Sequence, residues 1–253
     1  ELAKLKEVSV SQGLMLESIS NRLLKKGSAH YGSPDKVPEV RLEMINQAGK
    51  LKIPFTSGIL IGIGENRLER VEALLALRGL QEKYGHIQEI IIQNFKAKPR
   101  TPMQFHPEPE LEEILWTIAI ARILFGPEMN IQTPPNLNAN NLERILDAGI
   151  NDWGGISPLT PDHVNPEAPW PELENLSEKM TSLGKCLTER LAIYPSYAVN
   201  HQLWIDPKVL SRLRQLVDQQ GFAREDKWCA GEDNLPNIQQ KFSSEITKDQ
   251  NTP

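Results

Sequence analysis

The sequence predicts an α/β protein with a mainly parallel sheet, on three observations. Short apolar runs of strand length alternate with segments whose apolar residues recur at helical spacing. Nearly every predicted strand is separated from the next by a predicted helix, as in parallel βαβ units. The first predicted element is a helix. The pattern therefore looks like about six βα units of an eight-unit barrel whose N-terminal units are missing, and an open six-stranded α/β sheet is the alternative.

Six strands are predicted from apolar runs bounded by glycine, proline or polar residues. Their ranges are 13–17, 53–63, 87–95, 130–133, 150–157 and 190–194. The third run, IQEIIIQNF, is the clearest, whereas the fifth is rich in glycine.

Seven helices are predicted from apolar stripes at helical spacing. Their ranges are 1–8, 38–49, 68–80, 111–123, 142–149, 173–187 and 209–217. Residues 1–222 are accordingly predicted to form the partial barrel. Residues 223–253 form a polar C-terminal extension, for which we expect disorder after about 240.

Composition limits the function. The chain has 253 residues, 39% of them hydrophobic, and a net charge of -5, so no global field attracts nucleic acid or an anionic membrane. No apolar run approaches the roughly 20 residues that cross a bilayer. We expect a soluble, cytoplasmic protein that binds neither nucleic acid nor membrane. The chain begins with Glu1 rather than Met, which fits a processed, trimmed or partial chain.

Metal and nucleophile patterns are absent from the sequence. The two cysteines, Cys186 and Cys229, lie far apart and are predicted to be ordinary thiols. No CxxC, HExxH or GxSxG pattern occurs, so no metal ligand is predicted. Loop-like surroundings predict that His86, His106 and His201 lie at the surface.

Polar residues directly after the predicted strands are the candidate ligand-binding groups, because parallel sheets bind ligands at their carboxyl ends. Exposure of strand ends to solvent is the alternative reason for this polarity. The candidates, in chain order, are Glu17, Ser18, Gly58, Gly62, Glu65, Gln93, Asn94, Asn136, Asp162 and His163.

The run Gly58-Ile-Leu-Ile-Gly-Ile-Gly-Glu65 has two interpretations. Glycines on a strand allow a flat ligand or another backbone to approach closely. Alternatively, the run is a strand–turn–helix junction in which Gly64 supplies a positive φ. It is neither a P-loop nor a dinucleotide-binding fingerprint.

The adjacent pair Asp162-His163 is a candidate for proton transfer, since a carboxylate raises the pKa of a neighbouring histidine. Adjacent side chains often point apart, however. A structural loop with an aspartate turn is the alternative that the sequence favours.

The Gly58–Glu65 run resembles the GxIxGxxE pattern of radical S-adenosylmethionine (SAM) proteins, with Leu60 in the isoleucine position. Further stretches resemble the deazaflavin (7,8-didemethyl-8-hydroxy-5-deazariboflavin, FO) synthases of that superfamily. They are Leu14–Ser18, His30–Lys36, Pro54–Thr56, Gln93–Pro99, Pro134–Leu137, Asp152–Ser157 and Asn165–Trp170.

The resemblance implies a radical SAM barrel that closes the deazaflavin ring. In such an enzyme a reduced 4Fe-4S cluster cleaves SAM, and the deoxyadenosyl radical acts on a tyrosine–ribityluracil adduct supplied by a companion radical SAM subunit, with loss of ammonia. By position, Glu17 and Ser18 would face the ribose or amino acid part of SAM. Gly58, Gly62 and Glu65 would face its adenine.

By their position after predicted strands, the remaining candidates would line the substrate space of such a barrel; these are Gln93, Asn94, Asn136, Asp162 and His163.

The chain departs from the family in one respect. The CxxxCxxC motif that holds the cluster is absent. We therefore expect an N-terminal piece to exist elsewhere, and we expect this chain alone to bind no cluster and cleave no SAM. A related radical SAM cyclase of the menaquinone route and a non-catalytic truncated barrel that binds a partner subunit are the alternatives.

Overall fold

The computed structural model describes residues 1–157 and 159–224. The predicted disordered tail and Cys229 lie outside these residues. The helices and strands follow each other in the order α1 Leu2–Lys6, β1 Gln12–Gly13, α2 Pro38–Lys50, β2 Phe55–Ile61, α3 Arg67–Tyr84, β3 Ile87–Asn94, α4 Leu111–Phe125, β4 Ile131–Gln132, α5 Leu142–Ala148, α6 Leu173–Ser182, α7 Pro195–Val199, α8 His201–Trp204 and α9 Pro207–Leu216. Within the described ranges, no helix is both long and apolar enough to span a bilayer.

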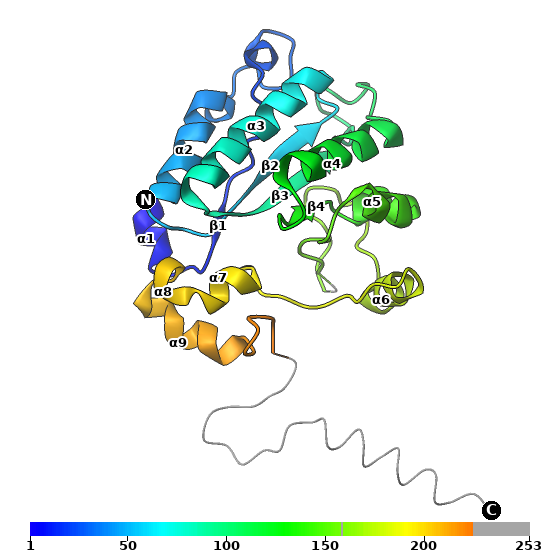
Figure 1. Cartoon of the computed structure of the whole chain (residues 1–253). Helices are drawn as coiled ribbons and strands as arrows, with labels where there is room; N and C mark the ends of the chain where they lie inside the picture. Colours follow the sequence, from blue (N-terminus) through cyan, green and yellow to red (C-terminus); the bar gives the residue numbers. More distant parts are fainter. Residues whose placement is uncertain (158, 225–253) are drawn as a thin grey trace, which may run out of the picture.

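The four strands form one parallel sheet in the order β1-β2-β3-β4. Helices α2 and α3 pack on β2, and α4 packs on β3 and β4, so these helices cover one face of the sheet (Figure 1). The alternation of residues along β2 explains this packing. Phe55, Ile59 and Ile61 are buried in the main core beneath the helices, whereas Thr56 lines a cavity on the other side. The predicted α/β class with parallel strands is confirmed.

Two of the six predicted strands are wrong. Residues 150–157 contribute a single bridge, between Asp152 and Gln132 of β4. The run then turns at Gly154, where φ is +74° and the backbone N–H donates to Asp152 Oδ1 at 2.6 Å. The glycine-rich run thus ends the ladder after one residue.

Residues 190–194 are not a strand either, because their backbone bonds to side chains and not to a neighbouring strand. Ala192 O accepts from Gln88 Nε2 at 3.2 Å, and Tyr194 N donates to Gln88 Oε1 at 3.1 Å. Gln88 belongs to the start of β3, so the segment crosses the amino ends of the strands. It leads into α7 and α8, which the sequence did not predict.

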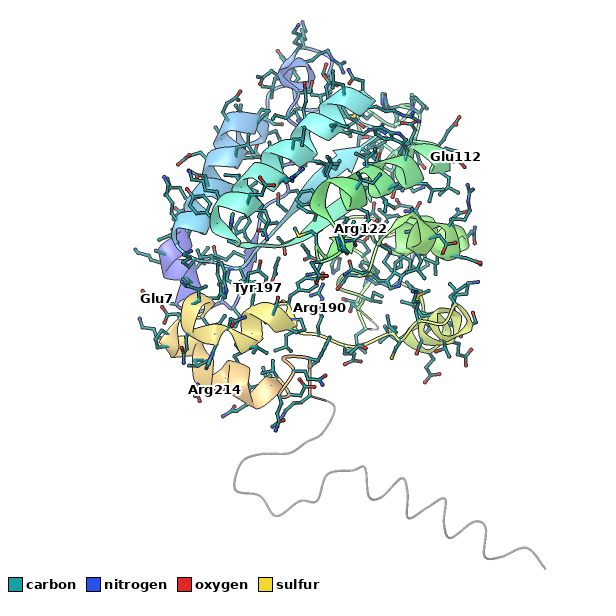
Figure 2. All side chains as sticks on the ribbon, viewed as in Figure 1. Glu7, Glu112, Arg122, Arg190, Tyr197 and Arg214 are labelled. Carbon is teal, nitrogen blue, oxygen red and sulfur yellow. The ribbon has the colours of Figure 1, made fainter. Side chains whose placement is uncertain are left out.

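A second, smaller core lies beside these amino ends. It contains Ile193, Tyr197, Trp204 and Leu213, contributed by the 190–194 segment and helices α7 to α9. Tyr197 Oη donates to Gly85 O at 2.8 Å, directly before β3. Figure 2 shows Tyr197 on the side of the sheet where α7 lies. The C-terminal helices therefore close the edge opposite the strand carboxyl ends.

Candidate active site at the carboxyl edge of the sheet

The predicted site residues gather at one edge because the four strands run in the same direction. Glu17 follows β1 and bridges Ile59, the 62–65 turn follows β2, Asn94 ends β3, and Asn136 follows β4. This edge is where open and closed α/β sheets place their ligands.

Glu17 is held by three basic side chains. Its carboxylate lies 3.0 Å from His30 Nε2 and 3.1 Å from Arg41 Nη1, and it also pairs with Lys36. Burial raises the pKa of Glu17. Hydrogen bonds from His30 and Lys36 and the charges of Lys36 and Arg41 outweigh burial and lower the pKa to about 2. Glu17 is therefore an ionised anchor at neutral pH. Sequence analysis found Glu17 but none of its partners, which come from a loop and from α2.

Ser18 is buried and accepts a hydrogen bond from Ser20 N at 3.1 Å. Its hydroxyl thus closes a tight turn after Glu17. The neighbouring Ser20 Oγ donates to Glu69 Oε1 at the start of α3, which ties the segment after β1 to the segment after β2.

Gly58 lies opposite Ile91 of β3. A Cβ at Gly58 would stand 2.1 Å from Ile91 O, so the neighbouring strand requires this glycine. Of the two close approaches that a glycine on a strand allows, the structure shows the backbone approach.

Glu65 closes the turn after β2. Its carboxylate accepts from Gly62 N at 2.8 Å and Ile63 N at 2.9 Å, and pairs with Arg70 Nε at 2.7 Å. Gly62 and Gly64 both have positive φ, +89° and +105°. The run is thus a strand–turn–helix junction, as the second interpretation predicted. The Glu65 side chain is almost fully buried in this role.

A network of amides and one carboxylate joins the ends of β3 and β4. Asn138 Nδ2 donates to Asn94 Oδ1 at 2.8 Å, and Asn136 Nδ2 donates to Asp162 Oδ2 at 2.9 Å. Asn94, Asn136 and Asn138 are all buried. The structure thus brings the predicted residues Asn136 and Asp162 together, although they lie 26 positions apart in sequence, and it places the predicted Asn94 against Asn138.

Asp162 and His163 do not form a pair. Asp162 Oδ1 accepts from Val164 N at 2.9 Å and Asn165 N at 3.1 Å, which is the aspartate turn of the favoured alternative. His163 is exposed. Burial raises the pKa of Asp162, but hydrogen bonds from Asn165 and Asn136 and from the two backbone N–H groups lower it below its usual range. A role for the pair in proton transfer stays a prediction, as does ligand contact by half-buried Gln93.

Lys98 joins the network from the segment after β3. Its Nζ donates to Asn165 Oδ1 at 2.8 Å and pairs with Glu167. Lys98 and Asn165 are polar residues that follow predicted strands, so the signal that found Asn94 and Asp162 also applied to them.

The residues described do not fit an iron–sulfur cluster. Residues 1–157 and 159–224 contain no group of three His, Cys, Asp or Glu side chains that could hold a metal ion. Cys186 is exposed, and its Sγ lies at 3.8 and 3.9 Å from Thr188 Oγ1 and Leu187 O.

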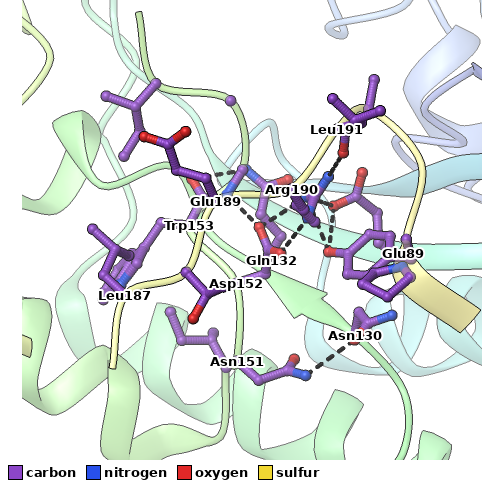
Figure 3. A pocket seen from close by; sticks show the side chains of 18 of the residues that line it. Glu89, Asn130, Gln132, Asn151, Asp152, Trp153, Leu187, Glu189, Arg190 and Leu191 are labelled. Atoms are coloured by element: carbon purple, nitrogen blue, oxygen red, sulfur yellow. Dashed lines mark hydrogen bonds and ion pairs between the residues drawn. The ribbon is translucent and has the colours of Figure 1, made fainter. Parts of the chain in front are cut away.

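A second polar site, which sequence reasoning missed, lies on the sheet face away from the helices. It lines a cavity of about 1360 Å3 (Figure 3). Arg190 donates to Asp152 Oδ2 at 2.7 Å and lies 3.3 Å from Glu89 Oε2, to which Tyr194 Oη donates at 3.0 Å. Burial raises the pKa of Glu89. The sequence did contain one sign of this site: Glu89 is the single charged residue in the apolar strand IQEIIIQN, and charged residues are rarely buried without a partner.

Several curated proteins are similar to this chain in sequence. No protein-family model matches the chain. The chain is 48% identical over 233 residues to an FO synthase of Streptomyces avermitilis, which covers 91% of this chain and 27% of that protein. It is 48% identical over 224 residues to a 7,8-didemethyl-8-hydroxy-5-deazariboflavin synthase of Methanopyrus kandleri, which covers 88% of this chain and 66% of that protein. The chain thus spans only part of these curated relatives.

A solved structure shares the fold. The crystal structure of methylornithine synthase superposes on 73% of this chain and 54% of its own chain, with a TM-score of 0.56 and 16% sequence identity. The 48% identity along nine-tenths of the sequence leads to one conclusion: the chain belongs to the FO synthase family, of whose members it spans a part.

Proposed function

We propose that this chain supplies the substrate-facing part of the barrel in an enzyme that forms the deazaflavin precursor FO. The reaction is closure of the deazaflavin ring in a tyrosine–ribityluracil adduct, with loss of ammonia. The observation that carries the proposal is the 48% identity to proteins named FO synthase and deazariboflavin synthase over about nine-tenths of the chain. The adduct would come from a companion radical SAM subunit, and we expect the enzyme to act in the cytoplasm.

The side chains at the carboxyl edge would bind and orient this substrate. Asn94 and Asn136 are buried amides that can hydrogen-bond to a polar, uncharged ring without carrying charge themselves. Gln93 and His163 would complete the substrate space. The network around Asp162 would hold the amides in place, which is the orienting role that a protein has in cofactor-driven chemistry.

Glu17, Ser18, Gly58, Gly62 and Glu65 would shape the SAM side of the site through the turns they build. Glu17 and Glu65 are engaged by cations and backbone N–H groups, so they would act by positioning the segments after β1 and β2. SAM would supply the radical precursor. The cluster ligands would belong to the part of the relatives that this chain does not cover.

The test is a chimera in which this chain replaces its matching 224-residue stretch in the Methanopyrus kandleri synthase. After anaerobic reconstitution, we expect the chimera to hold about four irons per chain and to form FO. We expect the chain alone to hold none and to release no deoxyadenosine from SAM.

A chimera carrying Asn94→Ala is the matched control, since the cluster site is untouched. We expect it to retain iron and deoxyadenosine release but to lose most FO formation. Deoxyadenosine release without FO in the unsubstituted chimera would assign the chain to another radical SAM cyclase. Absence of iron from the chimera would favour a non-catalytic barrel.

A further inference from the structure

Asn136 at the carboxyl edge has an amide group whose orientation is fixed by its surroundings. Its Nδ2 donates to Asp162 Oδ2 at 2.9 Å and to Ala168 O at 3.0 Å. Both partners are acceptors. An amide turned the other way would place its oxygen against a carboxylate and a carbonyl, which repel it. The Asn136 oxygen must therefore point away from these two partners.

That oxygen, Asn136 Oδ1, is buried and has no hydrogen-bond partner among the described residues, and the same is true of Thr133 Oγ1. The Asn136 and Thr133 side chains are 6% and 0% exposed. Both residues follow β4, three positions apart, at the edge where the strands end. A buried polar atom left unsatisfied is costly to the fold, and proteins retain such atoms where a ligand or an ordered water meets them.

Asp162 is committed to holding this arrangement. Its Oδ1 accepts from Val164 N and Asn165 N, and its Oδ2 accepts from Asn136 Nδ2 and Asn165 Nδ2, all at 2.9 to 3.1 Å. Four N–H donors thus bond to the carboxylate, and both of its oxygens hold the turn and Asn136 in place. Asp162 thus acts on a ligand through Asn136.

We propose that Asn136 Oδ1 and Thr133 Oγ1 accept hydrogen bonds from neutral N–H or O–H donors of the substrate, with Asp162 as the positioning residue. The proposal rests on the proposed function and adds one detail to it: the protein accepts these hydrogen bonds and the substrate donates them. An acceptor backed by a carboxylate disfavours anionic groups such as phosphate. The pyrimidine imide N–H and the ribityl hydroxyls of a deazaflavin precursor both supply the required donor.

The first test uses the chain itself and the nearly isosteric variant Thr133→Val. Because the hydroxyl has no protein partner, its removal should leave the urea midpoint of unfolding unchanged or raise it. Asn140→Ala, at an exposed position of the same turn, is the control and should not change the midpoint. A clear fall in the midpoint for Thr133→Val would show that a structural partner, such as a buried water, satisfies the hydroxyl, and would overturn the proposal.

The second test is calorimetric titration of the chain with FO, with its N3-methylated form, with uridine and with ribitol. Thr133→Val and Asp162→Ala should each weaken FO binding about tenfold or more. Asp162→Asn keeps one oxygen that can accept from Asn136 Nδ2, but its amide nitrogen replaces the other acceptor, so it should restore only part of the binding. Loss of binding on N3-methylation identifies the imide as the donor. Competition by ribitol identifies the hydroxyls.

The outcomes separate this inference from the proposed function. Binding of FO with an affinity that neither Thr133→Val nor Asp162→Ala changes would overturn the acceptor pair and leave the proposed function standing. Binding of uridine or ribitol that depends on Thr133, without binding of FO, would support the acceptor pair and count against the proposed function. Binding of none of the four compounds by the unmodified chain would overturn the inference.

Discussion

At the scale of single residues, His86 shows how tertiary packing changes the chemistry of a side chain. The prediction that His86 lies at the surface is wrong, because it is fully buried between α2 and the start of β3. Its Nε2 lies 2.9 Å from Ile45 O, and its ring stands edge-on to Tyr84 at 5.7 Å. Gly49 makes the space, since a Cβ there would stand 2.5 Å from the Tyr84 ring. Burial lowers the pKa of His86 to about 4.

Substitution of His86 should therefore change how stability depends on pH. The unfolded chain binds a proton near pH 6.5 and the folded chain only near 4, so the contribution of neutral His86 is complete above pH 6.5 and is lost as the pH falls toward 4. The full loss corresponds to about 3 kcal/mol. Urea unfolding between pH 7.5 and 4.5 should show a smaller fall for His86→Gln than for the unmodified chain. Equal slopes would contradict the buried, neutral imidazole. Glu17, with a pKa of about 2, titrates below this window.

At the scale of elements, the contact between β2 and β3 depends on Gly58. Residues 55 to 61 pair with β3 along their whole length, and Gly58 faces Ile91 in that register. The backbone of β3 occupies the position where a side chain at Gly58 would begin. The run Gly58–Glu65 therefore has a packing requirement at Gly58 and a turn requirement at Gly62 and Gly64.

Gly58→Ala should destabilise the fold by about 3 kcal/mol, since strand backbones cannot shift as easily as side-chain ends. Gly79→Ala is the matched control, because nothing lies within 4 Å of a Cβ at this position in α3. That change should stabilise the chain by about 0.5–1 kcal/mol through helix propensity. Chemical denaturation of both variants measures the two effects. A Gly58→Ala variant as stable as the unmodified chain would contradict the close approach of β2 and β3.

At the scale of the whole molecule, Arg190 ties the C-terminal helices to the sheet. It connects the segment before α7 with Asp152 beside β4 and with Glu89 in β3, and its guanidinium lies over the Tyr194 ring at 4.0 Å (Figure 3). The three charged side chains are at most 16% exposed. One arginine thus pairs with two carboxylates in the cavity.

Removal of Arg190 should leave both carboxylates buried without their cation. Arg190→Leu is expected to cost about 3–5 kcal/mol of unfolding free energy. Arg78→Leu, which breaks an exposed pair with Glu82 on α3, is the control and should change stability by about 0.5 kcal/mol or less. Guanidinium denaturation compares the two. An Arg190→Leu cost as small as that of the control would mean that water screens the cavity.

Part of the candidate site could be predicted because some of its residues stand directly after apolar strands, which a short stretch of sequence reveals. Glu17, Asn94 and Asn136 were found from their places after apolar strands, and parallel pairing then brought them to one edge. Their partners could not be found in this way. Lys36 and Arg41 reach Glu17 from a loop and from α2, and no pattern within a short window reports such a contact.

The sequence by itself determined the long elements and the turn after β2. Helices α2, α3 and α4 and strands β2 and β3 carry enough apolar periodicity to specify which face is buried, since each buries a continuous stripe or row. The 58–65 junction follows from its glycines and Glu65, which act over a few residues. The family followed from resemblance in several stretches between Leu14 and Trp170.

Only the tertiary structure decided what becomes of residues 150–157 and 190–194, whether His86 is buried, and how Asn136 presents its oxygen. The two short runs have the composition of strands, but a strand also needs a neighbour with free backbone groups along its length. Residues 150–157 turn at Gly154 after one bridge, and residues 190–194 meet the side chains of β3 instead of its backbone edge. Local patterns fix what a segment can form, whereas the neighbours that meet it in space fix what it does form.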